Sequence, residues 1–226
     1  MPAGLRIIAI DGPAGSGKST VARRVASRLG LDYLDTGAMY RSVAFEAMRR
    51  GIDPDDAATV AELARQIELT VDEKVTVNGA DATVEIRSPE VTRAVSVVAA
   101  NPEVRREMVM RQREWAEGRG GGVVEGRDIG TVVFPDSPVK VYLTANEEER
   151  ASRRSREMLD RDFGPAAAEV AHVAHELARR DRVDSTRAAS PLAVAEDAVQ
   201  IDTTGIDADE VVERVMALVA QRIGES

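Results

Sequence analysis

The chain has 226 residues, of which 43% are hydrophobic and 31% are charged, and its formal net charge is −9. This length and composition predict one folded domain and exclude global disorder, and the acidic balance argues against a binder of nucleic-acid polymers, which rely on many Lys and Arg contacts with phosphates. Without cysteine there are no disulfides or thiolate nucleophiles, and without an apolar run of ~20 residues there is no membrane partner, so we expect a cytoplasmic protein.

The chain begins with the pattern of a strand, a turn and a helix. Residues 6–11 (RIIAID) form a short β-branched run typical of a buried parallel strand, and a glycine-rich turn follows. From residue 19 apolar side chains recur at helical spacing until Gly30, which is placed to end the helix. Residues 32–35 and 37–51 predict a second strand and a second helix.

The middle of the chain predicts a small antiparallel insertion. Residues 53–65 have a moderate helical signal, whereas residues 67–86 alternate around Asn78-Gly79, which is a strong hairpin signal. Residues 89–115 return to helical periodicity, with a break at Asn101-Pro102.

Three further strands and a closing helix complete the predicted sheet. The strands begin near Val123, Val139 and Val199, and the last helix has an apolar face over residues 211–219. Residues 150–187 are polar and arginine-dense, which favours a mobile cover over a core element. Strands that alternate with helices predict an α/β fold with a mostly parallel sheet and helices on both faces.

A phosphate-binding motif lies between the first strand and the first helix. It matches G-x-x-x-x-G-K-[ST], in which backbone N–H groups and the helix N-terminus hold phosphate oxygens. The lysine reaches the β and γ phosphates, and Ser19 is the expected Mg²⁺ ligand. The predicted ATP-binding residues are Gly12, Pro13, Ala14, Gly15, Ser16, Gly17, Lys18, Ser19 and Thr20.

A triphosphate site could belong to an enzyme or to a GTP-binding switch. Such switches resemble one another in an N-K-x-D motif that reads guanine. The only lysines here are Lys18, Lys74 and Lys140, and none lies in that motif, so a switch is disfavoured. A transfer enzyme instead needs an arginine-rich pocket that holds an anionic acceptor in line with the γ phosphate.

Two segments supply candidates for that pocket. Residues 35–41 (DTGAMYR) and 125–131 (EGRDIGT) each follow a predicted strand, at the sheet edge where α/β proteins bind ligands. A third cluster, residues 179–187, crowds arginine and aspartate together, although a solvated helix face explains it equally well.

Together these residues resemble nucleoside monophosphate kinases and, more narrowly, the bacterial cytidylate kinase family. The resemblance covers nearly the whole chain, and its most specific parts are DTGAMYR and GRDIGTVVFP together with the insertion. It implies ATP-dependent phosphorylation of CMP and dCMP, with Mg²⁺, by a monomer. It also implies a P-loop kinase fold in a single domain (1–226), with a core (1–59, 96–149 and 188–226), a monophosphate-binding insertion at about 60–95 and a helical lid at about 150–187.

The resemblance also implies roles for particular residues. Arg41, Arg127 and Arg187 clamp the acceptor phosphate, since guanidinium forks fit a phosphate dianion. The base is read by Ser96, Arg105 and Asp128, and the ribose is held by Arg180 and Asp184. The remaining acceptor-site residues are Asp35 and Thr36, and the catalytic set is Lys18, Asp35, Arg41, Arg127, Arg150 and Arg154.

Base choice can also be argued from chemistry. The carboxylate of Asp128 would accept a hydrogen bond from the N4 amino group of cytosine and repel the O4 atom of uracil. We therefore expect an imperfect preference for CMP over UMP, and an enzyme that uses both remains an alternative.

Three side chains have a second interpretation. Asp35 either orients magnesium waters or the acceptor, or simply caps the following helix. Arg150 and Arg154 either reach the transferring phosphoryl group from a closing lid, or pair with Glu147 and Glu157 on the surface.

Overall fold

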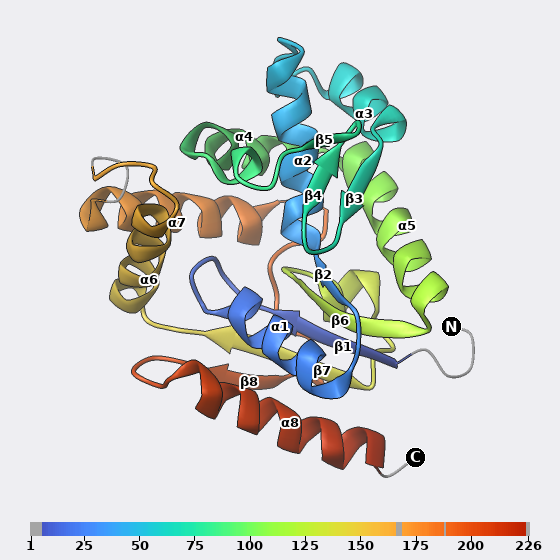
Figure 1. Cartoon of the computed structure of the whole chain (residues 1–226), viewed down its shortest axis with the longest axis vertical. Helices are drawn as coiled ribbons and strands as arrows, with labels where there is room; N and C mark the ends of the chain where they lie inside the picture. Colours follow the sequence, from blue (N-terminus) through green and yellow to red (C-terminus); the bar gives the residue numbers. More distant parts are fainter. Residues whose placement is uncertain (1–5, 166–168, 188, 225–226) are drawn as a thin grey trace.

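The computed structural model of the protein describes residues 6–165, 169–187 and 189–224 (Figure 1). The ends of the expected domain (residues 1–5 and 225–226) and parts of the expected lid and core (166–168 and 188) lie outside the described residues. Among the described residues, no helix is both long and apolar enough to cross a membrane.

A parallel sheet forms the centre of the molecule. Its strand order in the described chain is β2-β6-β1-β7-β8, and every neighbouring pair is parallel. The strands are β1 (Arg6–Asp11), β2 (Tyr33–Asp35), β6 (Gly121–Gly126), β7 (Val139–Thr144) and β8 (Val199–Asp202). The predicted parallel α/β sheet is therefore confirmed.

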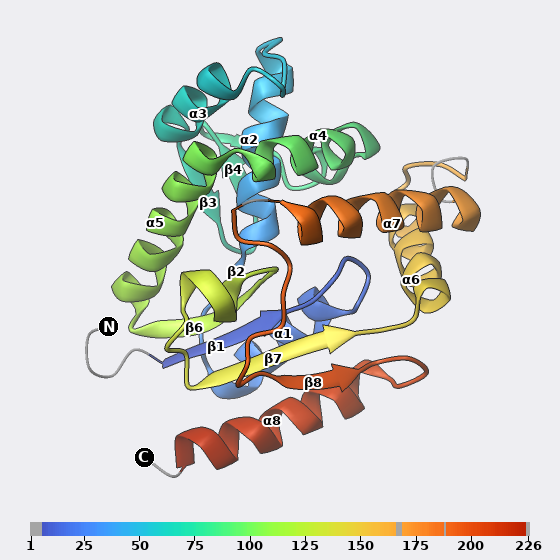
Figure 2. The ribbon, with the colours of Figure 1, turned by 180° about the vertical axis from the view of Figure 1, so that it is seen from behind.

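Helices cover both faces of this sheet (Figures 1 and 2). Alternate side chains of β1 enter different cores, because neighbouring residues of a strand point to opposite faces. Ile8 and Ile10 pack with α1 and α8, whereas Ile7 and Ala9 belong to the core that includes α2, α4 and α5. These helices are α1 (Lys18–Leu29), α2 (Thr36–Arg49), α4 (Pro89–Ala100), α5 (Pro102–Arg119) and α8 (Ala208–Gly224).

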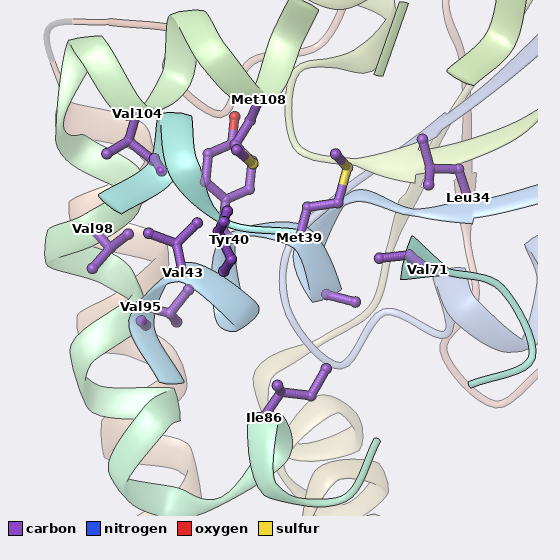
Figure 3. Close-up of a cluster of buried hydrophobic side chains, with 14 of the residues drawn as sticks. Leu34, Met39, Tyr40, Val43, Val71, Ile86, Val95, Val98, Val104 and Met108 are labelled. Carbon is purple, nitrogen blue, oxygen red and sulfur yellow. The ribbon is translucent and has the colours of Figure 1, made fainter. Parts of the chain in front are cut away.

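The larger core joins the main sheet to the small sheet. Figure 3 shows side chains of Tyr40 and Val43 on α2 among those of Val98 on α4 and Met108 on α5. All four are buried, and each fully buried large apolar side chain stabilises the fold by about 1.5–3 kcal/mol relative to an exposed one.

The small antiparallel sheet confirms the predicted hairpin. Its order is β3-β4-β5, and Asn78-Gly79 joins β4 to β5 with both residues at positive φ (49° and 79°), as a two-residue hairpin turn requires. The sheet runs from Leu69 to Asp81 and is shorter than the 67–86 segment that alternation predicted, and the end of that segment enters the helical turn η1. The elements are α3 (Ala57–Gln66), β3 (Leu69–Val71), β4 (Val75–Val77), β5 (Ala80–Asp81) and η1 (Glu85–Arg87).

The arginine-dense segment forms two helices, α6 (Glu147–Asp160) and α7 (Val170–Thr186). They stand beyond the carboxyl ends of β1 and β7, as the arrows in Figure 2 show. α6 begins directly after Asn146, whose side chain accepts a hydrogen bond from the amide of Glu149 at 2.8 Å and so caps the helix. Ala151, Val173 and Leu177 form a small apolar cluster that includes Ala14, so both helices pack against the phosphate loop.

Candidate active site

The loop between β1 and α1 has the backbone that phosphate binding needs. Gly12, Gly15 and Gly17 all have positive φ angles, and Gly17 precedes the first turn of α1. A Cβ on Gly12 would lie 2.0 Å from the backbone oxygen of Leu143, so only glycine fits where the loop crosses β7. The amides at the start of α1 have no helical partner and are available to an anion.

Lys18 lies buried at the centre of this loop. Its Nζ donates to the backbone oxygen of Pro13 at 2.8 Å. Burial and, to a smaller extent, the charge of Arg127 lower the pKa of Lys18 to about 7, against the opposing effect of Glu125. A bound phosphate would stabilise this buried ammonium group, because its negative charge would offset the neighbouring positive charges.

One cavity of about 170 Å³ connects the phosphate loop with the predicted acceptor residues. Its lining includes the carboxyl ends of β2 and β6 and residues of α4 and α7. Its lining includes eight cationic and five acidic side chains, so it carries excess positive charge in a chain whose net charge is −9. The ten predicted acceptor-site residues all line it: Asp35, Thr36, Arg41, Ser96, Arg105, Arg127, Asp128, Arg180, Asp184 and Arg187.

Arg41 is held rigidly on the side of this cavity next to the insertion. Its Nη1 donates to the backbone oxygen of Ile86 at 3.1 Å and to Thr92 Oγ1 at 2.8 Å. Burial lowers the pKa of Arg41 well below its usual value, and the charges of Arg180 and Arg154 act in the same direction. Like charges that are buried this close together are costly unless an anion binds between them.

Arg127 and Arg187 meet at the carboxylate of Asp184. Arg127 Nε donates to Asp184 at 3.0 Å, and Arg187 Nη1 lies 3.6 Å from its other oxygen. Burial opposes ionisation of Arg127, but Asp184 and Asp181 outweigh it and raise its pKa. Arg180, which was predicted to hold the ribose together with Asp184, lines the same cavity, and its Nε has no hydrogen-bond partner among the described residues. Burial and the charge of Arg127 lower the Arg180 pKa to about 10.

The three residues predicted to read the base lie together at the end of the cavity next to α5. Asp128 and Arg105 form a buried ion pair, and Arg187 Nη2 lies 3.9 Å from the other oxygen of Asp128. The guanidinium of Arg105 also stacks over the ring of Tyr40, 5.3 Å from its centroid. Ser96 lines the same end from α4 and is buried.

Asp35 caps the following helix, as its second interpretation predicted, and it also binds Arg87. Its Oδ1 accepts from the amide of Ala38 at 2.9 Å, which caps α2, while Oδ2 binds Arg87 at 3.0 Å. Burial opposes ionisation, but Arg87 outweighs it and holds the Asp35 pKa below its usual value. Thr36 next to it donates to the backbone oxygen of Glu125 at 2.6 Å.

Glu125, to which the sequence assigned no role, lies beside the predicted metal ligand Ser19. Glu125 accepts hydrogen bonds from Ser19 Oγ at 3.0 Å and from the hydroxyl of Tyr33. Burial raises the pKa of Glu125, and the charge of Asp35 adds to this effect. The position of Glu125 at the end of a strand beside β1 is the signal that sequence reasoning could have used.

The lid arginines lie in different places. Arg154 binds Glu157 at 2.7 Å, as its second interpretation predicted, and it also lines the acceptor cavity. Arg150 is buried behind the phosphate loop, where it binds Asp181 and the backbone oxygen of Ala14 at 3.3 Å rather than Glu147.

A second cavity, of about 620 Å³, lies on the other side of the phosphate loop. It is lined by loop residues 15–20 and by α6, including Arg153, which sequence analysis did not consider. Arg153 donates to the hydroxyl of Thr203 at 2.8 Å and to its backbone oxygen at 2.7 Å. Lys18, Ser19 and Arg154 line both cavities, which therefore meet at the phosphate loop.

A glycine-rich phosphate loop at the end of a parallel sheet, facing a cluster of buried arginines, defines a P-loop phosphotransferase. Comparison with known proteins gives the particular family. The family model described as cytidylate kinase matches residues 8–221, so the chain belongs to the cytidylate kinase family. Members of this family are nucleoside monophosphate kinases.

Individual relatives are similar over almost their full length. The chain is 50% identical to the cytidylate kinase of Mycobacterium leprae over 220 residues, covering 96% of this chain and 97% of the relative. It is also 50% identical to the cytidylate kinase of Geobacillus kaustophilus over 222 residues, with the same coverage of both chains. An uncharacterised protein from Eubacterium ventriosum has a similar fold, with a TM-score of 0.52 at 14% identity, covering 96% of this chain and 99% of that one.

Proposed function

We propose that this protein transfers the γ-phosphoryl group of ATP to the phosphate of CMP and dCMP. The observation that carries the proposal is that residues of the phosphate loop line the same cavity as Arg41, Arg127 and Arg187. In the transfer, an acceptor phosphate oxygen forms a bond to the γ phosphorus, and the bond from that phosphorus to the β–γ bridging oxygen breaks, releasing ADP.

The loop and the arginines would act by position and charge. The loop amides and Lys18 hold the β and γ phosphates, while Arg41, Arg127 and Arg187 neutralise the acceptor and fix its attacking oxygen. Arg154 lines both cavities, so it is placed to contact the phosphoryl group between them, and Arg150 supports the loop from behind. Asp184 binds Arg127 and lies 3.6 Å from Arg187, so it would hold these two guanidinium groups side by side for the acceptor phosphate.

The nucleoside would be held by the other acceptor-site residues. Asp128, Arg105 and Ser96 are proposed to read the cytosine, and Arg180 and Asp184 to bind the ribose. The carboxylate of Asp128 supports the preference for cytosine because it can accept from an amino group but not from a carbonyl.

Mg²⁺ would be held by Ser19 together with the donor phosphates. The residues fit this ion, because Ser19 Oγ and Glu125 Oε2, 3.0 Å apart, offer hard oxygen ligands. The described residues contain no cluster of three or more His, Cys, Asp or Glu side chains that could hold a metal. That fits an ion held mainly by phosphates and water. Bound there, Mg²⁺ would neutralise charge that develops on the β–γ bridge.

The chain organisation supports this arrangement. We propose a core at residues 1–59, 96–149 and 188–226, a monophosphate-binding insertion at about 60–95 and a lid at about 150–187, acting as a monomer in the cytoplasm. Arg41 contacts both η1 and α4, which supports an insertion that helps to form the acceptor site.

The test is an acceptor panel. ADP formation from ATP should be fastest with CMP and dCMP, slower with UMP, and close to background with AMP or with no acceptor. ADP formation that ignores the acceptor, or slow hydrolysis of GTP alone, would support a nucleotide switch instead.

A further inference from the structure

The buried carboxylate of Asp11 has no role in the proposed chemistry, although it lies directly before the phosphate loop. Asp11 ends β1 directly before the phosphate loop, and the register of the sheet places it beside Gly126 on β6. It is therefore next to the segment that carries Arg127 and Asp128. Burial raises the pKa of Asp11 to about 6, so a charge here is costly.

Both oxygens of Asp11 bind the backbone of one short helical turn. That turn is η2 (Ile129–Val133), and Asp128 directly precedes it. The amide of Ile129 donates to Asp11 Oδ1 at 2.9 Å, and the amide of Gly130 donates to Oδ2 at 2.8 Å. These are the first amides of the turn, which have no partner within it. Asp11 therefore caps a helical turn that lies 118 residues further along the chain.

The residue that would ordinarily provide this cap is Asp128. An aspartate directly before a helical turn commonly binds the first free amides with its own side chain. In the described structure Asp128 makes no such cap, and its carboxylate instead faces the cavity, where it binds Arg105. Asp11 satisfies the amides in its place, so the Asp128 carboxylate is free to face a ligand.

We propose that Asp11 is a positioning residue for base selection: by capping η2 it keeps the carboxylate of Asp128 turned towards the acceptor base. This inference rests on the proposed base-reading role of Asp128. Asp11 itself touches neither nucleotide in this scheme. Without it, the free amides of η2 would compete with the base for the Asp128 carboxylate.

The experiment compares kcat/KM for CMP and UMP in Asp11→Asn. In this variant the side-chain NH2 group replaces one of the two carboxylate oxygens. A donor then faces a backbone N–H of η2, so one of the two capping hydrogen bonds is lost. We expect the CMP to UMP ratio to fall at least about fivefold, as if one hydrogen bond to the base had been weakened. KM for ATP should change far less. If Asp11 only stabilised the fold, the substitution would reduce kcat/KM equally for CMP and for UMP, and their ratio would be unchanged. Asp11→Ser keeps one acceptor oxygen and gives the same comparison should the asparagine variant fold poorly.

Two further variants show whether a change in the ratio comes from lost stability or from Asp128 itself. Ser137→Ala removes a buried hydrogen bond to the backbone oxygen of Ile7 (2.8 Å), near the other end of β1, and should lower stability without changing the ratio. If Asp128→Asn lowers the ratio but the Asp11 variants do not, the positioning role of Asp11 is wrong. If Asp128→Asn leaves the ratio unchanged, base reading by Asp128 fails, and the inference about Asp11 fails with it.

Discussion

Replacing Arg41 with methionine should separate substrate binding from stability. Arg41 is 8% exposed and is surrounded by Arg180, Arg154 and Arg87, whose charges, together with burial, lower its pKa. Methionine keeps much of the side-chain volume and removes the charge. The variant should therefore fold, while its acceptor site loses one of three guanidinium groups.

The size of the expected fall in kcat/KM follows from the hydrogen bonds of Arg41. Its two bonds within the described structure both use Nη1, which leaves Nε and Nη2 for the acceptor phosphate. Two hydrogen bonds to a charged group contribute about 1.5–3 kcal/mol each, so kcat/KM for CMP should fall by about 10² or more. Stability changes little, because relief of repulsion among the buried arginines offsets the two lost bonds to Ile86 and Thr92.

The assay is steady-state kinetics together with thermal unfolding, with and without CMP. We expect a melting temperature close to that of the parent protein without ligand, and loss of the upward shift that CMP produces. Arg111→Met is the matched control, since the guanidinium of Arg111 likewise binds backbone oxygen, that of Ile67 (2.8 Å) and that of Arg65 (3.0 Å), but lies outside the cleft. An Arg41 variant that retains its affinity for CMP would refute the reasoning.

Three other changes test separate parts of the account. Lys18→Met should reduce kcat by at least ~10²-fold with the fold intact, as circular dichroism would check; an unchanged rate would remove Lys18 from catalysis. Asp128→Asn can donate to uracil O4, so the CMP to UMP ratio of kcat/KM should fall, and a constant ratio would count against base reading. Glu46 binds Arg49 and Arg50, and the Arg49 hydrogen bond is the main cause that lowers its pKa to about 2 from 4.5. Glu46→Gln should therefore lower the melting temperature above pH 5, and this deficit should shrink as the pH falls towards 2; a deficit independent of pH would contradict the assignment.

The phosphate loop and the strand ends were predictable because their signals are local. The spacing from Gly12 to Ser19 places a tight turn between a strand and a helix, and Asn78-Gly79 marks a hairpin within four residues. The strand order was not predictable in the same way. β6 is inserted between β1 and β2, and it is this long-range pairing that brings Glu125 to Ser19.

The parts of the site that sequence analysis missed depend on tertiary contacts. Arg87 is one arginine among many in the sequence, and only the packing of η1 against α2 brings it to Asp35. Arg150 and Arg154 are one helical turn apart, yet α7 and the phosphate loop enclose only Arg150. The cap that Asp11 provides joins residues 118 positions apart, so no local pattern could reveal it.

The central claim is that one cleft holds two nucleotides with their phosphates facing each other. Equilibrium binding of a compound that links adenosine and cytidine through five phosphates tests it most directly. We predict one molecule bound per chain, with much higher affinity than either ATP or CMP alone, and loss of that gain in both Lys18→Met and Arg41→Met. Binding no tighter than that of the better single nucleotide, or a gain that survives both substitutions, would contradict the account.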